Sequence, residues 1–170
     1  ERIRSLGGSP MDKLVLYLGI LAIGIMLQAL QTDEELAMHT VFHAKHAVNR
    51  AAHAAAQQVD SDKLAEGILA LDPVAAEQMA LLYLRENLRL DGELNPLPGS
   101  FLKQKVDIAV LELINSDRTF PYTYRNEEYD YEVTLYRPGV VLIVELDFPA
   151  TYRLLHPIRW AVKGAAELVR

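Results

Sequence analysis

The chain has 170 residues, a net charge of −6 and no cysteine, and 51% of its residues are hydrophobic. The missing cysteine excludes disulfides, thiolate catalysis and cysteine-based zinc sites, and the negative charge argues against nucleic acid as a partner. A chain of this length can bury one core of its own. We expect an N-terminal segment or tag at residues 1–12, a transmembrane helix at 13–31 and one extracytoplasmic domain at 32–170.

The segment at residues 14–30 is strongly hydrophobic and carries no charge. Because a bilayer core needs about 20 apolar residues in a helix, residues 13–31 are just long enough to span it. A cleaved signal peptide and a helix buried in a globular core are the alternatives. No small-x-small cleavage site follows Leu30. Gly19 and Gly24 would suit close helix packing in lipid or in a core.

The charges on the two sides of this segment predict its orientation. Basic residues resist translocation more than acidic ones do. The basic side chains that precede the segment are Arg2, Arg4 and Lys13, and the acidic ones that follow it are Asp33, Glu34 and Glu35. We therefore expect a cytoplasmic N-terminus. No function is predicted for residues 1–10, which could be a native leader, a processed end or an expression remnant.

The helix is predicted to continue to about Gln58, since the sequence after Asp33 is rich in alanine and free of Gly and Pro. From Asp12 it would then be about 70 Å long, so part of it must lie in lipid or against other subunits. Its outer half has two faces. The apolar face comprises Val41, Ala44, Ala47, Val48, Ala51, Ala52, Ala54 and Ala55, and the opposite face comprises His39, His43, His46, Arg50 and His53. A sheet or another helix should cover the small apolar side chains.

The histidines form a weak candidate metal site. His39, His43 and His46 have the helical spacing at which imidazoles converge on one ion. However, Lys45 and Arg50 bring positive charge to the same region, and no HExxH motif is present. A polar stripe that faces solvent or another subunit is the favoured interpretation, and a pH-responsive contact is the alternative. We predict no cofactor.

Short helices are predicted after Val59. Ser61 can cap one that runs to about Leu71, and the pair Asp72 and Pro73 is typical of a second helix start. This second helix should reach about Leu90 and bury Val74, Met79, Leu82 and Leu88. Residues 93–100 then form a loop with two prolines and a glycine.

The period of the apolar residues changes to two after this loop, which predicts strands. We expect strands at residues 106–111, 129–135, 140–148 and 158–168, with helix as an alternative for the last. The second and third should form a hairpin through Arg137, Pro138 and Gly139, in which glycine supplies a positive φ. The predicted fold class is α+β: a long N-terminal helix, two short helices and a small antiparallel sheet of about four strands on the alanine face.

Catalytic signals are weak, and we predict no enzyme. The carboxylates of Asp107, Glu112, Glu145 and Asp147 are best explained by a solvated sheet face, and no nucleophile or phosphate-binding motif is present. The acidic run at residues 126–130 lacks calcium-loop spacing and is interpreted as an exposed turn. The aromatic side chains that cluster near the strands are Phe120, Tyr122, Tyr124, Tyr129, Tyr131 and Tyr136. They are either strand-forming residues or a docking edge for a subunit.

The order of a basic N-terminus, one apolar helix, an alanine-rich segment (KHAVNRAAHAAA, residues 45–56) and late strands (residues 131–155) resembles the TadE/TadG-like minor pseudopilins of tight-adherence pilus systems. The resemblance implies a pilin-like fold and a non-enzymatic subunit of a pilus or secretion assembly, with the bilayer and other pilin-like or platform subunits as partners. The interface residues would be Gly19, Gly24, Ala44, Ala47, Val48, Ala51, Ala55, Tyr122 and Tyr124. A membrane-tethered sensor or ligand-binding module is the alternative, and a hydrolase without a recognisable motif is a weaker one.

Overall fold

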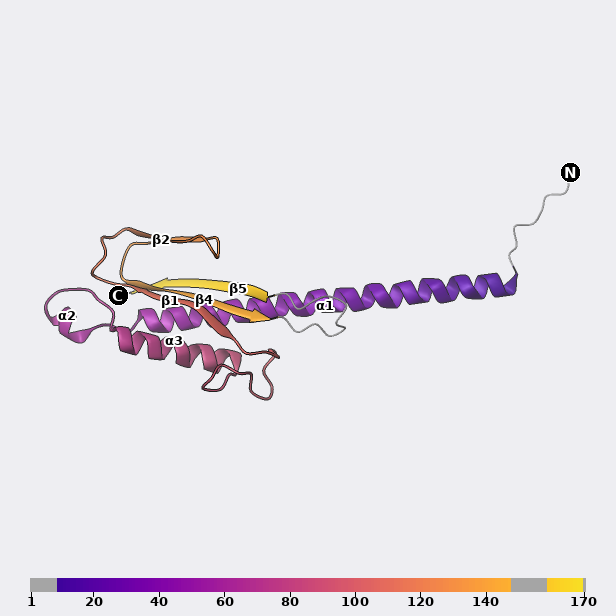
Figure 1. Ribbon diagram of the computed structural model, residues 1–170, viewed down its shortest axis with the longest axis horizontal. Helices are drawn as coiled ribbons and strands as arrows, with labels where there is room; N and C mark the ends of the chain where they lie inside the picture. The colour runs from indigo at the N-terminus through magenta and orange to yellow at the C-terminus, as the bar shows by residue number, and fades with distance from the viewer. Residues whose placement is uncertain (1–8, 148–158, 170) are drawn as a thin grey trace.

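The computed structural model describes residues 9–147 and 159–169. In chain order the elements are helices α1 (Pro10–Ala56), α2 (Ser61–Ala65) and α3 (Pro73–Leu88), then strands β1 (Asp107–Ile114), β2 (Tyr122–Asn126), β3 (Tyr131–Leu135), β4 (Gly139–Asp147) and β5 (Arg159–Glu167). The first half of α1 projects beyond a body that contains all the other elements (Figure 1). The α+β class, the long N-terminal helix, the two short helices and the small antiparallel sheet are therefore confirmed.

Helix α1 is one uninterrupted helix of 47 residues. It begins slightly before the predicted start because Ser9 and Asp12 form a capping box: the Ser9 backbone N–H donates to Asp12 Oδ2 at 2.7 Å, and the Asp12 N–H donates to Ser9 Oγ. Pro10 at the first helical position is preset for this geometry. No glycine lies between Gly24 and Gly67, and no proline between Pro10 and Pro73, so nothing in the sequence breaks α1 where it enters the body.

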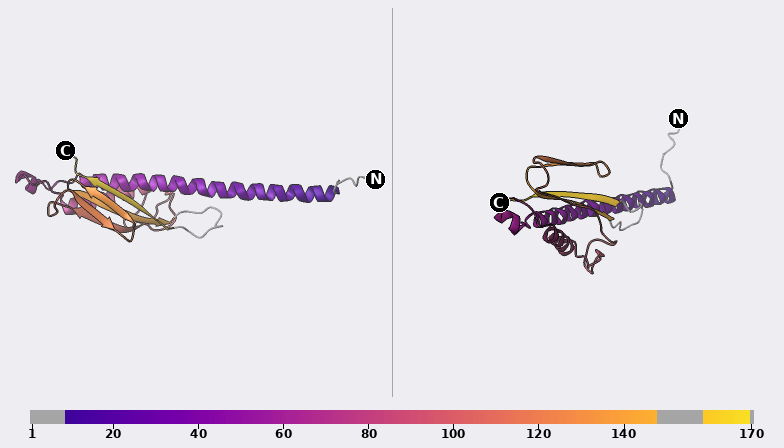
Figure 2. Two further views of the ribbon diagram at one scale, coloured as in Figure 1. Left: turned by 90° about the horizontal axis from the view of Figure 1, so that it is seen from above. Right: turned by 60° about the vertical axis from the view of Figure 1, so that its left-hand side comes forward.

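The body has three layers around a central sheet (Figure 2). The sheet is antiparallel with the order β1-β4-β5. The outer half of α1 and helix α3 pack on one face, and the two-stranded ribbon of β2 and β3 packs on the other. Strand β4 supplies both faces: its side chains at Val140, Leu142 and Val144 face the helices, whereas Val141 and Ile143 face the ribbon. This explains why β4 reads as an almost continuous apolar run.

The predicted hairpin between the second and third predicted strands, residues 129–135 and 140–148, is wrong. Strand β3 pairs with β2, and β4 pairs with β1 and β5. Gly139 is not a positive-φ turn residue; Gly67 and Gly99 are the described glycines with positive φ. A Cβ on Gly139 would lie 2.5 Å from the Ala166 carbonyl oxygen, so Gly139 serves the close approach of two strands instead. Because β4 is apolar on both faces, the central position of the sheet suits it better than a hairpin at the edge.

The strand at residues 122–126 was predicted only as an aromatic cluster, and the structure makes it β2. The last predicted strand is confirmed as β5, which removes the helix alternative. Its Val162, Gly164 and Ala166 are buried, as the alternation predicts. Phe148 and Ile158, which the predictions included in strands, lie outside the described residues.

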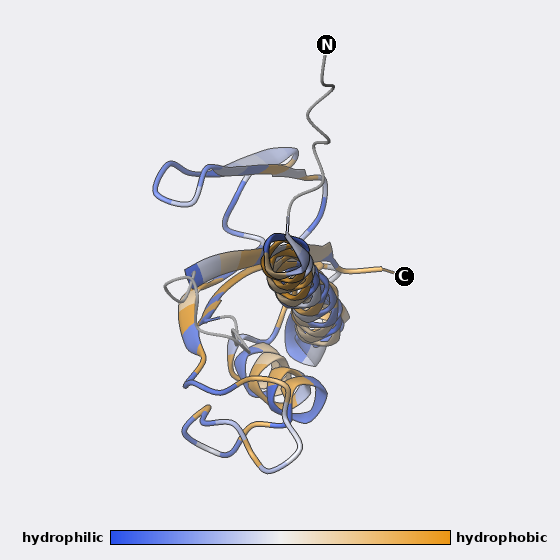
Figure 3. Ribbon diagram, turned by 90° about the vertical axis from the view of Figure 1, so that its right-hand side faces the viewer, coloured by the Kyte–Doolittle hydropathy of each residue, from blue (hydrophilic) through white to orange (hydrophobic). Residues whose placement is uncertain are grey.

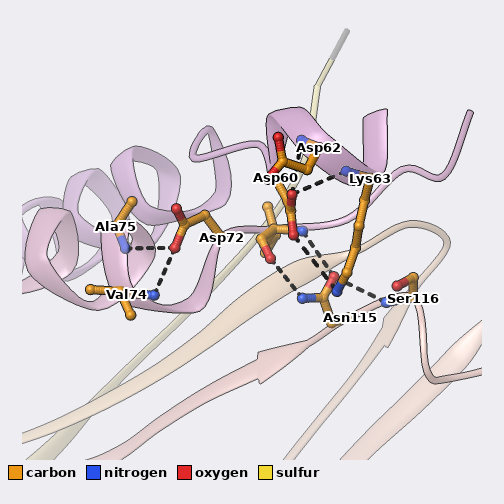
Figure 4. Close-up of polar contacts among 9 residues, drawn as sticks. Asp60, Asp62, Lys63, Asp72, Val74, Ala75, Asn115 and Ser116 are labelled. Carbon is orange, nitrogen blue, oxygen red and sulfur yellow. Dashed lines mark hydrogen bonds and ion pairs between the residues drawn. The ribbon is translucent and has the colours of Figure 1, made fainter. Parts of the chain in front are cut away.

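Helix α3 begins as predicted, because the Asp72 carboxylate accepts hydrogen bonds from the N–H groups of Val74 and Ala75 (Figure 4). Its predicted buried face is confirmed at Leu88 and holds in part at the half-buried Met79, but it is wrong at Val74, which is 65% exposed, and at Leu82, which is 44% exposed. The side chains that α3 buries are Ala76, Ala80, Leu84 and Leu88. Alanines at these positions let α3 approach the alanine face of α1 closely, which large side chains would prevent.

Helix α2 is shorter than predicted, and its cap is Asp60 rather than Ser61. The same region holds a clamp between distant segments. The Asn115 side chain at the end of β1 accepts a hydrogen bond from the Leu71 N–H at 2.9 Å and donates to the Leu71 carbonyl at 2.8 Å (Figure 4). This pair of bonds ties the start of α3 to the sheet.

Candidate functional site

The first half of α1 is a bare apolar surface. Its large hydrophobic side chains between Leu14 and Leu30 are each 48–67% exposed, and no part of the apolar window is buried. Figure 3, which looks along α1, shows the hydrophobic colouring of this helix. Within the described residues, α1 is the one helix long and apolar enough to cross a membrane. The structure therefore does not bury this segment in the core of the chain, and it fits a single-pass membrane protein.

Gly19 and Gly24 lie on this bare surface. A Cβ at either position would meet nothing within 4 Å, so neither glycine is needed for packing within the described chain. On a helix in lipid, a glycine has no side chain that would keep a second helix at a distance, so the two backbones can approach closely. These two positions are therefore free for contact with another helix.

The alanine face of α1 packs inside the body. Its residues Ala44, Ala47, Val48, Ala51 and Ala55 are at most 2% exposed. They lie against α3, β4 and β5, as the prediction of a covering sheet or helix required. The contact is close: a Cβ on Gly164 of β5 would lie 2.9 Å from Val48 Cγ1. The expectation that these five residues form a subunit interface is thus corrected, because the protein's own sheet and helix already cover them.

A charged contact borders this packed face. Lys45 Nζ donates to the backbone carbonyl of Lys163 on β5. Partial burial of the Lys45 side chain, followed by the nearby charge of Lys163, lowers the pKa of Lys45 from its ordinary value. The contact therefore links β5 to α1, while the Lys45 ammonium loses part of its hydration.

The histidines lie on the exposed side of α1. His39 Nε2 is 4.0 Å from Glu35 Oε1, and the ring of His43 lies 5.7 Å from the ring of Phe101. His46 and His53 are exposed. Among residues 9–147 and 159–169, no group of three His, Cys, Asp or Glu side chains is arranged to hold a metal ion. The described structure thus gives the three candidate ligands no further support as a metal site.

The tyrosines hold the β2–β3 ribbon on the sheet. Tyr124 is 5% exposed and packs with Ile143 and Leu135, and Tyr122 is half-buried at the margin of the same cluster. The Lys163 ammonium lies 5.9 Å from the centre of the Tyr131 ring. The expectation that Tyr124 forms part of a docking edge is corrected, because its side chain is buried inside the body. The role of the half-buried Tyr122 as an interface residue stays a prediction.

Two of the strand carboxylates, Asp107 and Glu145, belong to a charge network. Asp107 and Glu145 lie opposite each other on β1 and β4. Arg159 of β5 pairs with both, its Nε lying 3.0 Å from Glu145 Oε2 and its Nη2 contacting Asp107. The Tyr129 hydroxyl donates to Glu145 Oε1 at 3.1 Å. The network joins all three strands of the sheet to the ribbon, and sequence spacing could not reveal Arg159 as its centre.

A hollow of about 290 Å³ opens between α3, the loop that follows it and the start of β1. The apolar lining is Leu81, Leu94, Val106 and Ile108, and the remaining lining is Arg85, Gly92, Glu93, Lys105 and Asp107. The sequence analysis missed this hollow, because no motif marks it and its residues come from three separate elements.

Comparison with protein-family models, with curated proteins and with solved structures found no match. The fold and the surface alone therefore define the class: an α+β protein with one candidate membrane-spanning helix that leaves the body as a continuous rod. Three features of this chain bear on its function, namely the bare glycine-bearing half of α1, the tightly covered alanine face and the hollow beside α3.

Proposed function

We propose that this protein is a membrane-anchored, non-enzymatic subunit of a pilus-like or secretion assembly, similar in layout to the TadE/TadG-like minor pseudopilins. The single observation that carries the proposal is the division of α1. One half is apolar and bare, and the other half is the packed core helix of the body. A subunit that assembles through its membrane helix needs both properties in one element.

The continuity of α1 supports assembly over simple tethering. A tether needs only a flexible link between anchor and domain. Here the helix runs without a break from Pro10 to Ala56, and the body packs on it from Thr40 onward. The orientation of the body is then set by the orientation of the helix in the bilayer. A fixed orientation benefits a subunit that must match its neighbours.

The bare half also offers a means of lateral contact. In lipid, helix association depends on close packing more than on hydrophobicity, and small residues permit it. Gly19 and Gly24 supply small positions that the described body does not use. Other pilin-like or platform subunits would pack there, with the N-terminus cytoplasmic and the body outside, as the flanking charges favour.

Cysteine cross-linking in the native membrane tests this proposal. Because the chain has no cysteine, single cysteines at each of positions 18–26 would report contacts without background. We expect cross-links, to a second copy or to another membrane protein, that recur with a helical period of about 3.6 residues. Tyr136→Cys is the matched control, since Tyr136 is 68% exposed on the body and away from the lipid segment. If no position in the series exceeds this control, α1 is a solitary anchor and the assembly role is wrong.

A membrane-tethered ligand-binding module is the second candidate function. The hollow beside α3 favours it, because it combines apolar walls with a few charged groups, as small-molecule sites do. In that case α1 would anchor the body without lateral partners, and the cross-linking series would be negative.

A further inference from the structure

The hollow beside α3 is a built feature of the fold. The Asp91 carboxylate accepts hydrogen bonds from the N–H groups of Glu93 at 2.8 Å and Asn95 at 2.9 Å, which fixes the loop that forms one wall. The Val106 N–H donates to the Leu94 carbonyl at 3.1 Å and ties this loop to the start of β1. The opposite wall is the last turns of α3. The hollow is therefore held open by the backbone.

Positive charge is left without a direct partner in this hollow. Arg85 Nε is buried and has no hydrogen-bond partner within the described chain. No hydrogen bond or ion pair involves the Lys105 side chain among residues 9–147 and 159–169. Arg85 Nε is itself covered by protein atoms, so a ligand in the hollow would contact the other nitrogens of the Arg85 guanidinium together with the exposed Lys105 ammonium.

The two acidic residues of the lining balance this charge only in part. Asp107 is already paired with Arg159 outside the hollow. Glu93 is reached by Asn95 Nδ2 at 3.5 Å, a long hydrogen bond. Arg85 acts on Asp91 by charge alone: backbone hydrogen bonding from Asn95 is the main cause that lowers the pKa of Asp91, and the Arg85 charge is the weakest. Neither carboxylate of the lining pairs with Arg85 or Lys105 in the described structure.

The remaining walls are apolar. Leu81 lies one helical turn before Arg85 on α3, Val106 lies just before β1, and Ile108 belongs to β1. A volume of about 290 Å³ lies at the lower limit of small-molecule sites. The ligand must then be small, with an anionic group and a short hydrocarbon part.

We infer that this hollow binds a small monocarboxylate with an aliphatic chain of a few carbons. Its carboxylate would contact Arg85 and Lys105, and its chain would lie against Leu81, Val106 and Ile108. Guanidinium and ammonium groups favour a carboxylate over a neutral group of the same size. This inference goes beyond the assembly role and does not depend on it, since the hollow lies in the body and the assembly contacts lie in the bare half of α1.

Equilibrium dialysis tests the inference with full-length protein in nanodiscs and radiolabelled hexanoate as the probe. Empty nanodiscs give the blank for partitioning into lipid. We expect saturable binding of one hexanoate per chain, and binding of hexan-1-ol at least tenfold weaker. Lys105→Gln should weaken hexanoate binding at least tenfold. Lys103→Gln is the matched control, because Lys103 is exposed nearby but does not line the hollow.

A second variant fills the hollow without removing a charge. A Cβ on Gly92 would meet nothing within 4 Å, so Gly92→Phe can be accommodated at the rim and should abolish binding. Three outcomes would overturn the inference: uptake no greater than that of empty nanodiscs, hexanoate binding unchanged in Lys105→Gln and Gly92→Phe, or hexan-1-ol binding as tight as hexanoate. None of them bears on cross-linking through α1, so failure here is distinct from failure of the assembly role.

Discussion

The two halves of α1 belong to one helix, but one half is exposed on all sides and the other is buried on one face. The half at residues 14–30 is made mostly of large apolar side chains and is bare, whereas the half that packs in the body buries a face made largely of alanine. Hydrophobicity therefore does not predict which half is in the core. Side-chain size does, because alanine lets the sheet and α3 approach the helix axis, while leucine and isoleucine suit a lipid environment.

The same substitution in each half should give the largest contrast. Ala51→Asp places a carboxylate where the structure is 0% exposed, and we expect the body to lose at least about 3 kcal/mol or to fail to fold. Ala22→Asp lies on the bare half, so the body should keep its melting temperature in detergent while membrane insertion becomes less favourable by about 2.5–3.5 kcal/mol. Near-UV circular dichroism and membrane fractionation measure the two effects. An equal loss of melting temperature in both variants would mean that the bare half is part of the folded body.

Glycine-to-alanine substitutions should show the same difference between the body and the bare half of α1, with smaller changes in the free energy of unfolding. In Gly139→Ala the new Cβ would lie 2.5 Å from the Ala166 carbonyl oxygen and 3.2 Å from the Glu167 Cα, which are backbone atoms that cannot move aside. We expect a loss of about 1–3 kcal/mol in denaturant unfolding. Gly19→Ala meets no atom within 4 Å and should leave the unfolding of the body unchanged. A stable Gly139→Ala variant would show that β4 and β5 can separate without cost.

The smallest expected effect concerns pH. Residues 14–30 carry no charge, so acid should act through the body. Hydrogen bonds from Asn95, first of all, lower the pKa of Asp91 below its ordinary value. A carboxylate with a depressed folded-state pKa contributes stability above the ordinary pKa, and this contribution is lost as the pH falls through the folded-state value. Asp91→Asn should therefore be less stable than the wild type at neutral pH.

Below the folded-state pKa of Asp91, the two proteins should converge, and urea unfolding at several pH values measures this. Asp117→Asn is the control, because the Asp117 side chain is 72% exposed and its loss should change stability by no more than about 0.5 kcal/mol. A wild-type advantage that persists at low pH would show that the Asp91 charge has no part in fixing the loop.

Local signals in the sequence predicted much of the fold. The uninterrupted α1, the helix start at Asp72 and Pro73, and the alternation of β5 depend on contacts between near neighbours, which periodicity and capping residues record. The existence of the alanine face on α1 was predictable for the same reason, although the particular strands and helix that cover it were not. In each case the physical cause lies within a few residues of the effect.

Features that depend on distant partners could not be predicted in this way. The pairing of β3 with β2 rather than β4 is decided by which sheet face each strand covers. The buried face of α3 depends on how closely this helix can approach α1. Small alanine side chains allow a close approach, so Ala76 and Ala80 are buried there while Val74 and Leu82 are exposed. The hollow is lined by Arg85 of α3 and by Lys105 of the loop that precedes β1, which are twenty residues apart in the sequence. In the sequence, Arg85 and Lys105 form no recognisable motif that would indicate a shared site.

The capping box at Ser9 and the packing against β5 lie toward opposite ends of a helix of 47 residues, about 70 Å in length. Such a helix acts as a lever. Membrane helices tilt over a range of tens of degrees, and a change of about 10° in the bilayer would swing the far end of α1 by about 12 Å. In the proposed membrane-anchored subunit, a shift in lipid thickness, or the arrival of a neighbouring helix at Gly19, would thus displace α2 by a large distance.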